Sequence, residues 1–500
     1  MSNHPEGPDE ARPGWATLLS GRNFVHALIL AGGVMLHAGT IFIVTTILPS
    51  VVGTIGGLDY YAWSTTLFVI ASILGAALSG KLLGRAGAGN AYLVAAALFA
   101  AGGLVCAAAP SFPVLLAGRF VQGFGGGLFS ALAYGVIRLI LPEALWSRAI
   151  SLISVTWGTA TLIGPAVGGV FAEIGAWRAA FWTPSIPALL FGLLAVVILP
   201  KRGGVSPAAM PVPFAQLGLL VASVLAVSAG SVTSKVGWNV AGIGAAAALA
   251  VLLLVVEARS RARILPSPVL GRDGALAALY GLIPCLIMGM QADVFIPYFL
   301  QVLHGLSPLV AGYLAALMAA GWTLGSLVSG GRSGEAARRV LRAGPVFVLM
   351  GLAVLAVLVP TPGEVWRMPA TGLGLVVVGL GIGVAWPHLV TGLFRRIPAA
   401  EQGLAASSIT TVQHYATAFG AALAGMLANA GGLSDPGGVD GARGAALWLF
   451  AGLLAAPILG MAAAWRATRR GGEQGATEPA TARRAHSPSS PLMRPGRSPA

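Results

Sequence analysis

The residue best suited to do chemistry is Asp293, an acidic residue inside an apolar stretch that runs past Gly289 toward Pro297. The other fifteen of the sixteen acidic residues fall in loops, in tails or near the ends of apolar stretches. A charge at the centre of a bilayer costs about 2.5–3.5 kcal/mol, so its presence there indicates a function. Because removal from water favours the neutral form of a carboxyl group, we predict that Asp293 binds and releases a proton. The alternative is that Asp293 lies near the outer headgroups and only pairs with a neighbour.

Three histidines also fall inside apolar stretches, namely His37, His388 and His414. Imidazole titrates near neutral pH, so each could assist proton transfer. A polar contact between helices is the simpler interpretation for each, and no metal-ligand spacing links them. Cys106 and Cys285 are apolar in context and predict neither a disulfide framework nor a metal site. No phosphate-binding Gly-x-x-x-x-Gly-Lys-Ser/Thr pattern occurs, so we expect no nucleotide site and no other cofactor.

Composition places these residues in a membrane protein. Of 500 residues, 56% are hydrophobic and only 9% are charged, whereas a soluble domain carries about 25% charged residues. Such a chain cannot cover a water-facing surface, which excludes a soluble globular enzyme. The net charge of +14 does not indicate nucleic-acid binding, because the basic residues lie in short loops and in the C-terminal tail.

Apolar stretches long enough to span a bilayer position the candidate residues. A hydrocarbon core of about 30 Å requires roughly 20 apolar residues per helix. The sequence predicts an all-α polytopic protein with fourteen spans, at about 24–48, 61–80, 91–109, 114–141, 150–171, 179–199, 214–233, 238–256, 275–302, 309–330, 341–360, 369–394, 403–429 and 444–465. The polar N-terminus lacks an apolar run, so we expect no cleavable signal peptide.

The distribution of basic residues predicts the orientation of these spans. With fourteen spans and a cytoplasmic N-terminus, 25 of the 30 basic residues fall in inside segments and four fall outside. This bias follows the positive-inside rule. We therefore expect a multi-pass protein of the plasma (inner) membrane with both termini in the cytoplasm.

The spans group as six, two and six. Duplicated bundles that face each other form the midplane cavity of many transporters, and we expect two pseudo-symmetric six-helix bundles. The predicted divisions are a cytoplasmic segment 1–23, a first bundle 24–200, a linker with two additional helices 201–273, a second bundle 274–465 and a disordered basic tail 466–500. The tail is expected to be solvated, although its charge would also suit anionic lipids.

Glycine and proline are concentrated in the fifth predicted helix. Segment 158–169 reads GTATLIGPAVGG and contains Gly158, Gly164, Pro165, Gly168 and Gly169. Glycines at this spacing let membrane helices approach closely, and a proline inside a helix removes a backbone hydrogen bond and bends it. Ordinary helix packing would use the same residues, but their density favours a bending or sealing element.

Several motifs together resemble the major facilitator superfamily, in particular its fourteen-helix drug:proton antiporters. The resemblance covers about residues 24–465. The motifs are 80–87 (GKLLGRAG), 118–127 (GRFVQGFGGG), the antiporter motif 158–169, 177–181 (WRAAF) with Pro187, Glu257 with Pro266, and 300–308 (LQVLHGLSP) with Gly312.

The resemblance implies roles for specific residues. Gly80, Lys81 and Arg85 would belong to a conformational gate, and Arg119 would lie inside the fourth helix. There Arg119 would tune a proton-binding group or hold the first helix; alternatively, Arg119 and Gln122 satisfy buried backbone carbonyls.

Two departures from the family pattern weaken this transfer. Gly84 stands where the gate motif has an acid, and Thr40 stands where the first helix often has an aspartate. Both departures put the usual coupling arrangement in doubt.

The predicted cavity is mostly apolar with a few polar anchors, which suits amphipathic ligands. Its expected lining residues are Thr40, Phe42, Thr45, Gln122, Gln291 and Gln301. The predicted function is proton-coupled efflux of amphipathic small molecules or drugs by alternating access. A proton-coupled metabolite importer is the main alternative; an intramembrane enzyme and a scaffold are weaker ones. The expected partners are lipid, substrate and protons, with a monomer or a periplasmic adaptor complex both open.

Overall fold

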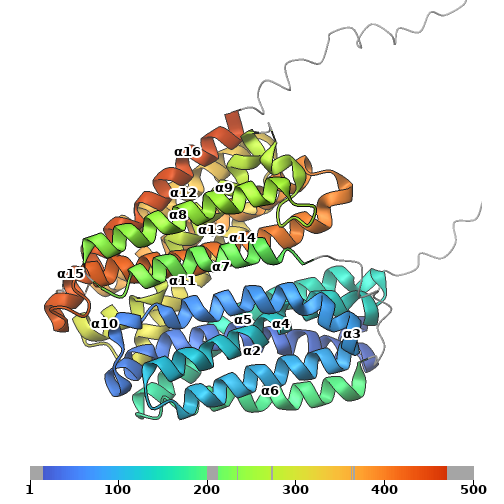
Figure 1. Cartoon of the computed structure of the whole chain (residues 1–500), viewed down its shortest axis with the longest axis horizontal. Helices are drawn as coiled ribbons and strands as arrows, with labels where there is room; N and C mark the ends of the chain where they lie inside the picture. The colour runs from blue at the N-terminus through green and yellow to red at the C-terminus, as the bar shows by residue number, and fades with distance from the viewer. Residues whose placement is uncertain are drawn as a thin grey trace, which may run out of the picture.

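The protein is described from a computed structural model that covers residues 15–199, 212–233, 235–271, 274–361, 363 and 366–469. The described residues form helices and short connections (Figure 1). The first half contains α1 (Trp15–Leu18), α2 (Gly21–Ile55), η1 (Leu58–Tyr60), α3 (Trp63–Ala108), α4 (Phe112–Ile140), α5 (Glu143–Glu173) and α6 (Ala179–Ile198). The middle contains α7 (Phe214–Gly230), α8 (Val236–Arg259) and η2 (Ser267–Leu270). The second half contains α9 (Gly274–Met290), η3 (Gln291–Val294), α10 (Ile296–His304), α11 (Pro308–Ser329), α12 (Gly334–Leu358), α13 (Arg367–Arg396), η4 (Ala399–Glu401), α14 (Gln402–Ala430), α15 (Gly438–Leu453) and α16 (Ala455–Arg469).

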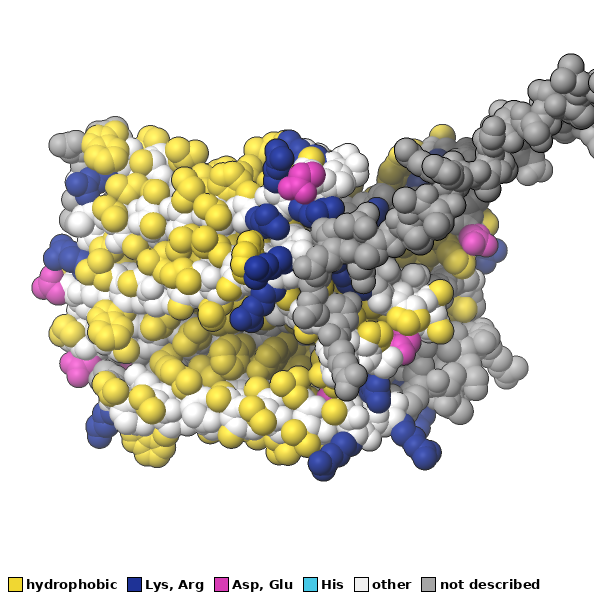
Figure 2. Space-filling model, turned by 90° about the horizontal axis from the view of Figure 1, so that it is seen from above, with side chains coloured by type: hydrophobic (Ala, Val, Ile, Leu, Met, Phe, Trp, Pro, Cys, Tyr) yellow, Lys and Arg dark blue, Asp and Glu magenta, His cyan; other side chains and the backbone are white. Residues whose placement is uncertain are grey.

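The long helices have the length and composition of membrane spans. Within the described ranges, eleven helical segments are long and apolar enough to cross a bilayer. Figure 2 shows hydrophobic side chains over the face between charged side chains near its two ends. This pattern is typical of a protein surrounded by lipid, because lipid-facing positions must be apolar.

The helix α3 contains two of the predicted spans. Its two arms meet at Gly87, whose φ of 78° and ψ of 169° are non-helical and favour glycine because it has no Cβ. Both arms pack against α4, through the contacts of Gly123 with Phe68, Gly127 with Ser72, Gly118 with Cys106 and Gly125 with Phe99. Along α4 these contacts run in opposite directions on the two arms, so the chain reverses near Gly87. The motif expected in a loop at 80–87 is therefore helical up to this reversal.

The predicted count of fourteen spans is not confirmed. The seventeen-residue helix α7 is shorter than the other candidates, and α14 is not among the eleven apolar segments. Serine, threonine and glutamine lower the apolarity of α14. The observed range is therefore eleven to fourteen candidate spans.

The helices form two halves with a hairpin beside them. In Figure 1, helices α2–α6 lie in one half, and α9–α16 lie in the other. The hairpin of α7 and α8 lies along the second half, where the hydroxyl groups of Ser223 and Tyr415 are 3.0 Å apart. The halves approach each other near α10 and α11 and diverge toward the end where α2 begins.

Several predicted segments fall wholly or partly outside the described residues. These are most of the N-terminal segment, the proline-containing linker at 200–211 and the tail from 470 onward. The described residues show that the predicted boundary between the last helix and the tail lies too early in the chain. Residues 466–469, predicted to begin the disordered tail, instead form the last turn of α16.

Candidate functional site

Asp293 lies at a break in a membrane-spanning segment. The helix α9 ends at Met290, residues Gln291–Val294 form the 3-10 turn η3, and α10 follows with Pro297 in its first turn. Asp293 is half-buried, and no salt bridge found among the described residues includes it. A 3-10 turn inside a membrane-spanning segment replaces the regular i→i+4 backbone bonds by i→i+3 bonds, and a short stretch of this kind within a helix often marks a functional position.

Directly after Asp293, aromatic rings join the two halves. Tyr61, just before α3, stacks on Phe295 with ring centroids 4.9 Å apart. Tyr298 contacts Tyr61 edge-on at 5.5 Å, and Phe299 stacks on Phe295 at 5.9 Å. Asp293 is thus two residues from an aromatic contact between the halves.

Arg119 has neutral contacts. Its side chain is 2% exposed, and its Nη1 donates to Oε1 of Gln122 at 2.8 Å. Its Nε donates to the carbonyl oxygen of Ser64 at 3.4 Å, and its guanidinium lies 4.1 Å from the ring centroid of Phe68. The carbonyl contact agrees with the simpler of the two interpretations of Arg119. No described salt bridge joins Arg119 to Asp293.

His37 extends this cluster. Its ring stacks on Phe68 at 5.3 Å and approaches Trp157 edge-on at 6.1 Å. The Nδ1 atom of His37 is buried and makes no hydrogen bond within the described structure. His388 instead contacts the carbonyl oxygen of Ser329 at 3.0 Å, which is the helix contact expected for it.

The six expected cavity residues occupy separate environments. Four of them lie in the first half. Gln122 accepts a hydrogen bond from Arg119, and Thr40 is buried. The hydroxyl of Thr45 donates to the carbonyl of Ile41, and Phe42 lies against Gly164. In the second half, Gln291 bonds to the carbonyl of Ile287, and the Nε2 atom of Gln301 is buried without a partner. The described contacts do not bring all six into one site.

The glycines of α5 make close contacts at one end of the molecule. A Cβ on Gly164 would clash with Phe42, and one on Gly168 would approach the backbone of Ile43 in α2. A Cβ on Gly169 would clash with the backbone of Leu309 in α11, across the two halves.

Gly312 of α11 extends this close contact, whereas Gly158 of the α5 motif takes no part in it. Gly312 lies against both Thr46 and Pro165. Gly158, by contrast, has open space around it. The α5 helix is continuous from Glu143 to Glu173 through Pro165. The close-packing face is therefore restricted to the later glycines of the motif.

At the end where α5 meets α11, two polar side chains make contacts that the sequence did not predict. Asn429 of α14 donates to the carbonyl oxygens of Asp59 at 2.9 Å and Ser231 at 2.7 Å. These bonds connect the second half to both the first half and the hairpin. The Glu173 carboxylate accepts from the backbone N–H of Leu309 at 3.4 Å. Asn429 is neutral and occurs among small residues, so charge-based analysis could not single it out.

The predicted gate residues lie at the opposite end. Lys81 places its ammonium 4.8 Å from the ring centroid of Phe214, at the start of the hairpin. Gly80 and Arg85 are exposed. The gate segment is thus in contact with the hairpin.

Glu257 is a buried acid near the end of α8, a position at which the sequence predicted a solvated side chain. It is 1% exposed. Its carboxylate accepts from the backbone N–H groups of Ile264 and Leu265 and from Nε2 of Gln216. Three donors explain how a carboxylate can be buried at this point. Its role is to fold the connection after α8 back onto the hairpin.

Metal binding is not supported by the described side chains. No group of three or more histidine, cysteine, aspartate or glutamate residues within the described ranges could hold an ion.

Comparisons with known proteins point to one family. The family model described as Major Facilitator Superfamily matches residues 30–421 of this chain. A probable multidrug-efflux transporter of Mycobacterium tuberculosis (strain H37Rv) is 38% identical over 465 residues, covering 91% of this chain and 97% of the relative. The multidrug transporter protein MdtP of Bacillus subtilis is 25% identical over 402 residues, covering 78% and 72%.

Solved structures share the fold at low sequence identity. A bacterial homologue of the lysosomal transporter Spinster, in an inward-facing conformation, has a TM-score of 0.63 at 16% identity, with 89% of this chain and 96% of that chain covered. A D-xylose-proton symporter has a TM-score of 0.62 at 16% identity, with 90% and 98% covered.

Proposed function

Because this chain belongs to the major facilitator superfamily, we propose that it exports amphipathic small molecules by alternating access in exchange for protons. It is a multi-span membrane transporter and not an enzyme. Its relative at 38% identity is named a probable multidrug-efflux transporter and is matched over nearly its whole length. That name supports export of drug-like compounds as the transport direction.

The observation that carries the proposal is the closed contact between the halves at the end near α10 and α11. The contact combines Gly169 against Leu309, Gly312 against Thr46, and Tyr61 against Phe295. The halves diverge toward the other end (Figure 1). An arrangement closed at one end is one of the two states that alternating access requires. By the positive-inside rule, the closed end would be the outer one.

Asp293 is the group that we propose couples protons to transport. It combines an intramembrane position, partial burial and the absence of a salt bridge among the described residues. Its place beside the aromatic contact of Tyr61 and Phe295 would let its charge affect closure of the outer end. Arg119 would act as a positioning residue, because its guanidinium fixes Gln122 and the Ser64 carbonyl.

The substrate class follows from the same side chains. Close to Asp293 in the chain, Phe295 and Phe299 belong to an aromatic cluster with Tyr61, and the amide of Gln291 bonds to the carbonyl of Ile287. Apolar surfaces with few polar groups suit amphipathic molecules. Export would take place at the plasma membrane, with both termini cytoplasmic and lipid as the surrounding partner.

Uptake by inverted membrane vesicles tests the direction and the coupling. We expect vesicles that contain the protein to accumulate ethidium when an acid-inside pH gradient is imposed, and to lose it when an uncoupler is added. For one-to-one exchange, a gradient of one pH unit supports about tenfold accumulation. An importer would not fill such vesicles, and equal uptake by vesicles without the protein would refute transport.

The variant D293N tests the coupling residue. Asparagine keeps the shape of the side chain but cannot release a proton, so we expect loss of gradient-driven ethidium uptake with unchanged expression and size-exclusion profile. The matched control is D59N, because Asp59 contributes its backbone carbonyl rather than its carboxylate to the contact with Asn429. Full gradient-driven uptake by D293N would remove Asp293 from the mechanism and leave the transport proposal standing.

A further inference from the structure

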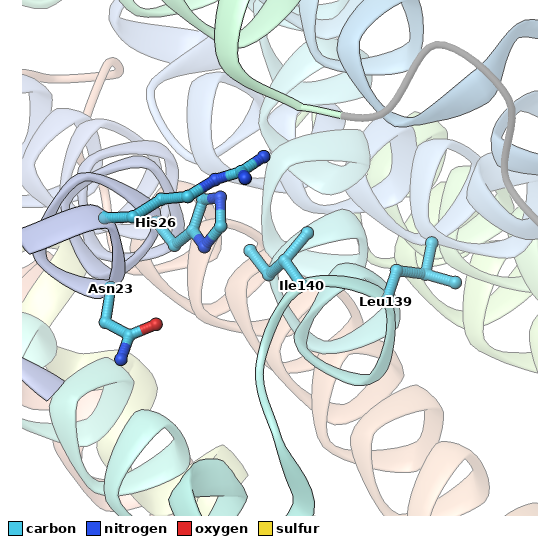
Figure 3. A pocket seen from close by; sticks show the side chains of 5 residues that line it. Asn23, His26, Leu139 and Ile140 are labelled. Carbon is cyan, nitrogen blue, oxygen red and sulfur yellow. The ribbon is translucent and has the colours of Figure 1, made fainter. Parts of the chain in front are cut away.

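A pocket of about 290 Å³ lies between the start of α2 and the end of α4, away from Asp293 and the aromatic contact. It is lined by Arg22, Asn23, His26, Leu139 and Ile140. Figure 3 shows the imidazole of His26 and the side chain of Ile140 pointing toward each other across this space. The transport mechanism proposed above does not use these residues.

His26 provides the main indication that the pocket receives a ligand. The residue is 5% exposed, and both ring nitrogens are buried without a hydrogen-bond partner in the described structure. At least one imidazole nitrogen always carries a hydrogen and requires an acceptor. Buried polar groups are normally hydrogen-bonded, so an acceptor that enters the pocket would satisfy His26.

The charge around His26 selects an anion. Arg22 is exposed one turn before His26, and no described salt bridge includes it. Ser20, the residue that precedes α2, makes no side-chain capping bond to the helix. The first backbone N–H groups of a helix lack partners within the helix, and together with the helix dipole they favour phosphate and carboxylate groups.

The surroundings select an amphipathic ligand rather than a soluble ion. Leu139 and Ile140 form an apolar wall of the pocket. Nearby in the chain, Trp15, Leu19 and Phe24 are 46%, 49% and 46% exposed. Exposed aromatic residues beside a basic residue are typical of the membrane–water interface.

We propose that this pocket binds the phosphate group of an anionic phospholipid in the adjoining leaflet. Arg22, His26 and the first turn of α2 hold the phosphate, and the apolar wall of Leu139 and Ile140 contacts the start of an acyl chain. The predicted orientation places this end at the cytoplasmic leaflet, whose anionic lipids attract basic residues. The site belongs to the first half alone, so its occupancy is independent of the coupling role of Asp293.

Photocrosslinking of the full-length protein tests the site directly. The probe is phosphatidylglycerol with a photoreactive group, incorporated into nanodiscs, and the labelled peptides are mapped by mass spectrometry. We expect labelling around Leu139 and Ile140 that unlabelled phosphatidylglycerol competes away. Phosphatidylcholine and equimolar inorganic phosphate should compete poorly.

Two variants and one control make the result specific. R22Q should lower labelling about tenfold, since a hydrogen bond to a charged group is lost, and R22Q/H26Q should lower it further. Arg22 is exposed, so R22Q does not disturb the core. The control R395Q removes an exposed arginine from the end of α13 and should label like the native protein. Equal labelling of R22Q, or efficient competition by inorganic phosphate, would overturn the proposal.

Discussion

At the residue scale, the two intramembrane charges have different environments. Arg119 is buried, contacts an amide and a carbonyl, and lies over the ring of Phe68. Asp293 is half-buried beside a break in its helix. A permanently charged group with fixed contacts suits a structural or positioning role, whereas a carboxyl group at a backbone break can gain and lose a proton. This contrast supports the division of roles between Asp293 and Arg119.

The sequence indicates Asp293 as a candidate because it is an acid inside an apolar stretch, and its coupling role stays a prediction. Glu257 escaped this reasoning because it stands at the end of α8, where acids are commonly solvated. Its burial depends on the backbone of Ile264 and Leu265 folding back onto it. Such a contact is set by tertiary structure and leaves no local pattern.

A pH-dependent contact joins η2 to η4. Both carboxylate oxygens of Glu401 accept hydrogen bonds from Ser267, one from the side chain at 2.6 Å and one from the backbone N–H at 2.7 Å. These bonds, first that of the side chain, lower the pKa of Glu401 below its ordinary value. A lowered pKa means that the contact stabilises the folded protein at neutral pH and that this stabilisation is lost as the pH falls through the pKa of Glu401.

We therefore predict that E401Q lowers the Tm by about 1–3 °C at pH 7. The difference from the native protein should shrink as the pH falls through the pKa of the native Glu401, which lies below the ordinary value for a glutamate. Thermal unfolding of both proteins in detergent between pH 3.5 and pH 7 measures this difference in Tm. E335Q is the control, because the ion pairs of Glu335 among the described residues are with Arg338 and Arg339 of its own helix, at the surface. A Tm difference that is constant with pH would show that the carboxylate charge is irrelevant.

At the element scale, the order and type of most helices could be predicted from apolar length. The separate spans 61–80 and 91–109 predicted the reversal between them, but not that the connection stays helical up to Gly87, because three glycines within 80–87 favour a loop. The break of α9 and α10 was also missed, although Gly289 and Pro297 flank it. Apolarity determines that a segment enters the membrane, whereas breaks depend on packing with neighbouring helices.

The glycines of α5 illustrate the same limit. Their spacing predicted a close-packing face, and Gly164, Gly168 and Gly169 lie in tight contacts. The sequence could not distinguish Gly158, which has open space beside it. The difference depends on where α2 and α11 cross α5.

This difference predicts the effect of adding a methyl group at each end of the motif. G169A should separate α5 from α11 at the closed end, because its Cβ would meet the backbone of Leu309. Spin labels at the exposed positions Ile174 and Val310, in a chain whose native cysteines are replaced, report this separation as a longer distance. The control G158A should leave the distance unchanged. If both variants gave the same distances, the contact of Gly169 would not determine closure.

At the scale of the whole molecule, the hairpin associates mainly with the second half. Ser223 contacts Tyr415, and Asn429 bonds to the carbonyl of Ser231. Its described contact with the gate segment is that of Lys81 with Phe214. A rocking motion of the two halves would therefore carry the hairpin with α14 and shift it relative to the gate segment.

If transport requires the closed end to open, a covalent bond across it should stop transport. Thr46 of α2 and Gly312 of α11 lie in direct contact, so T46C/G312C places two thiols across the halves within reach of a disulfide, whose Cβ atoms lie about 3.5–4.5 Å apart. We expect oxidation to abolish ethidium uptake by inverted vesicles and a reductant to restore it, since the bond holds one of the two required states. T45C/G312C is the control, because Thr45 is the adjacent residue and bonds within its own helix; it should crosslink poorly and keep its activity under oxidant. Undiminished uptake by fully crosslinked T46C/G312C would mean that the halves do not separate at this end during the cycle.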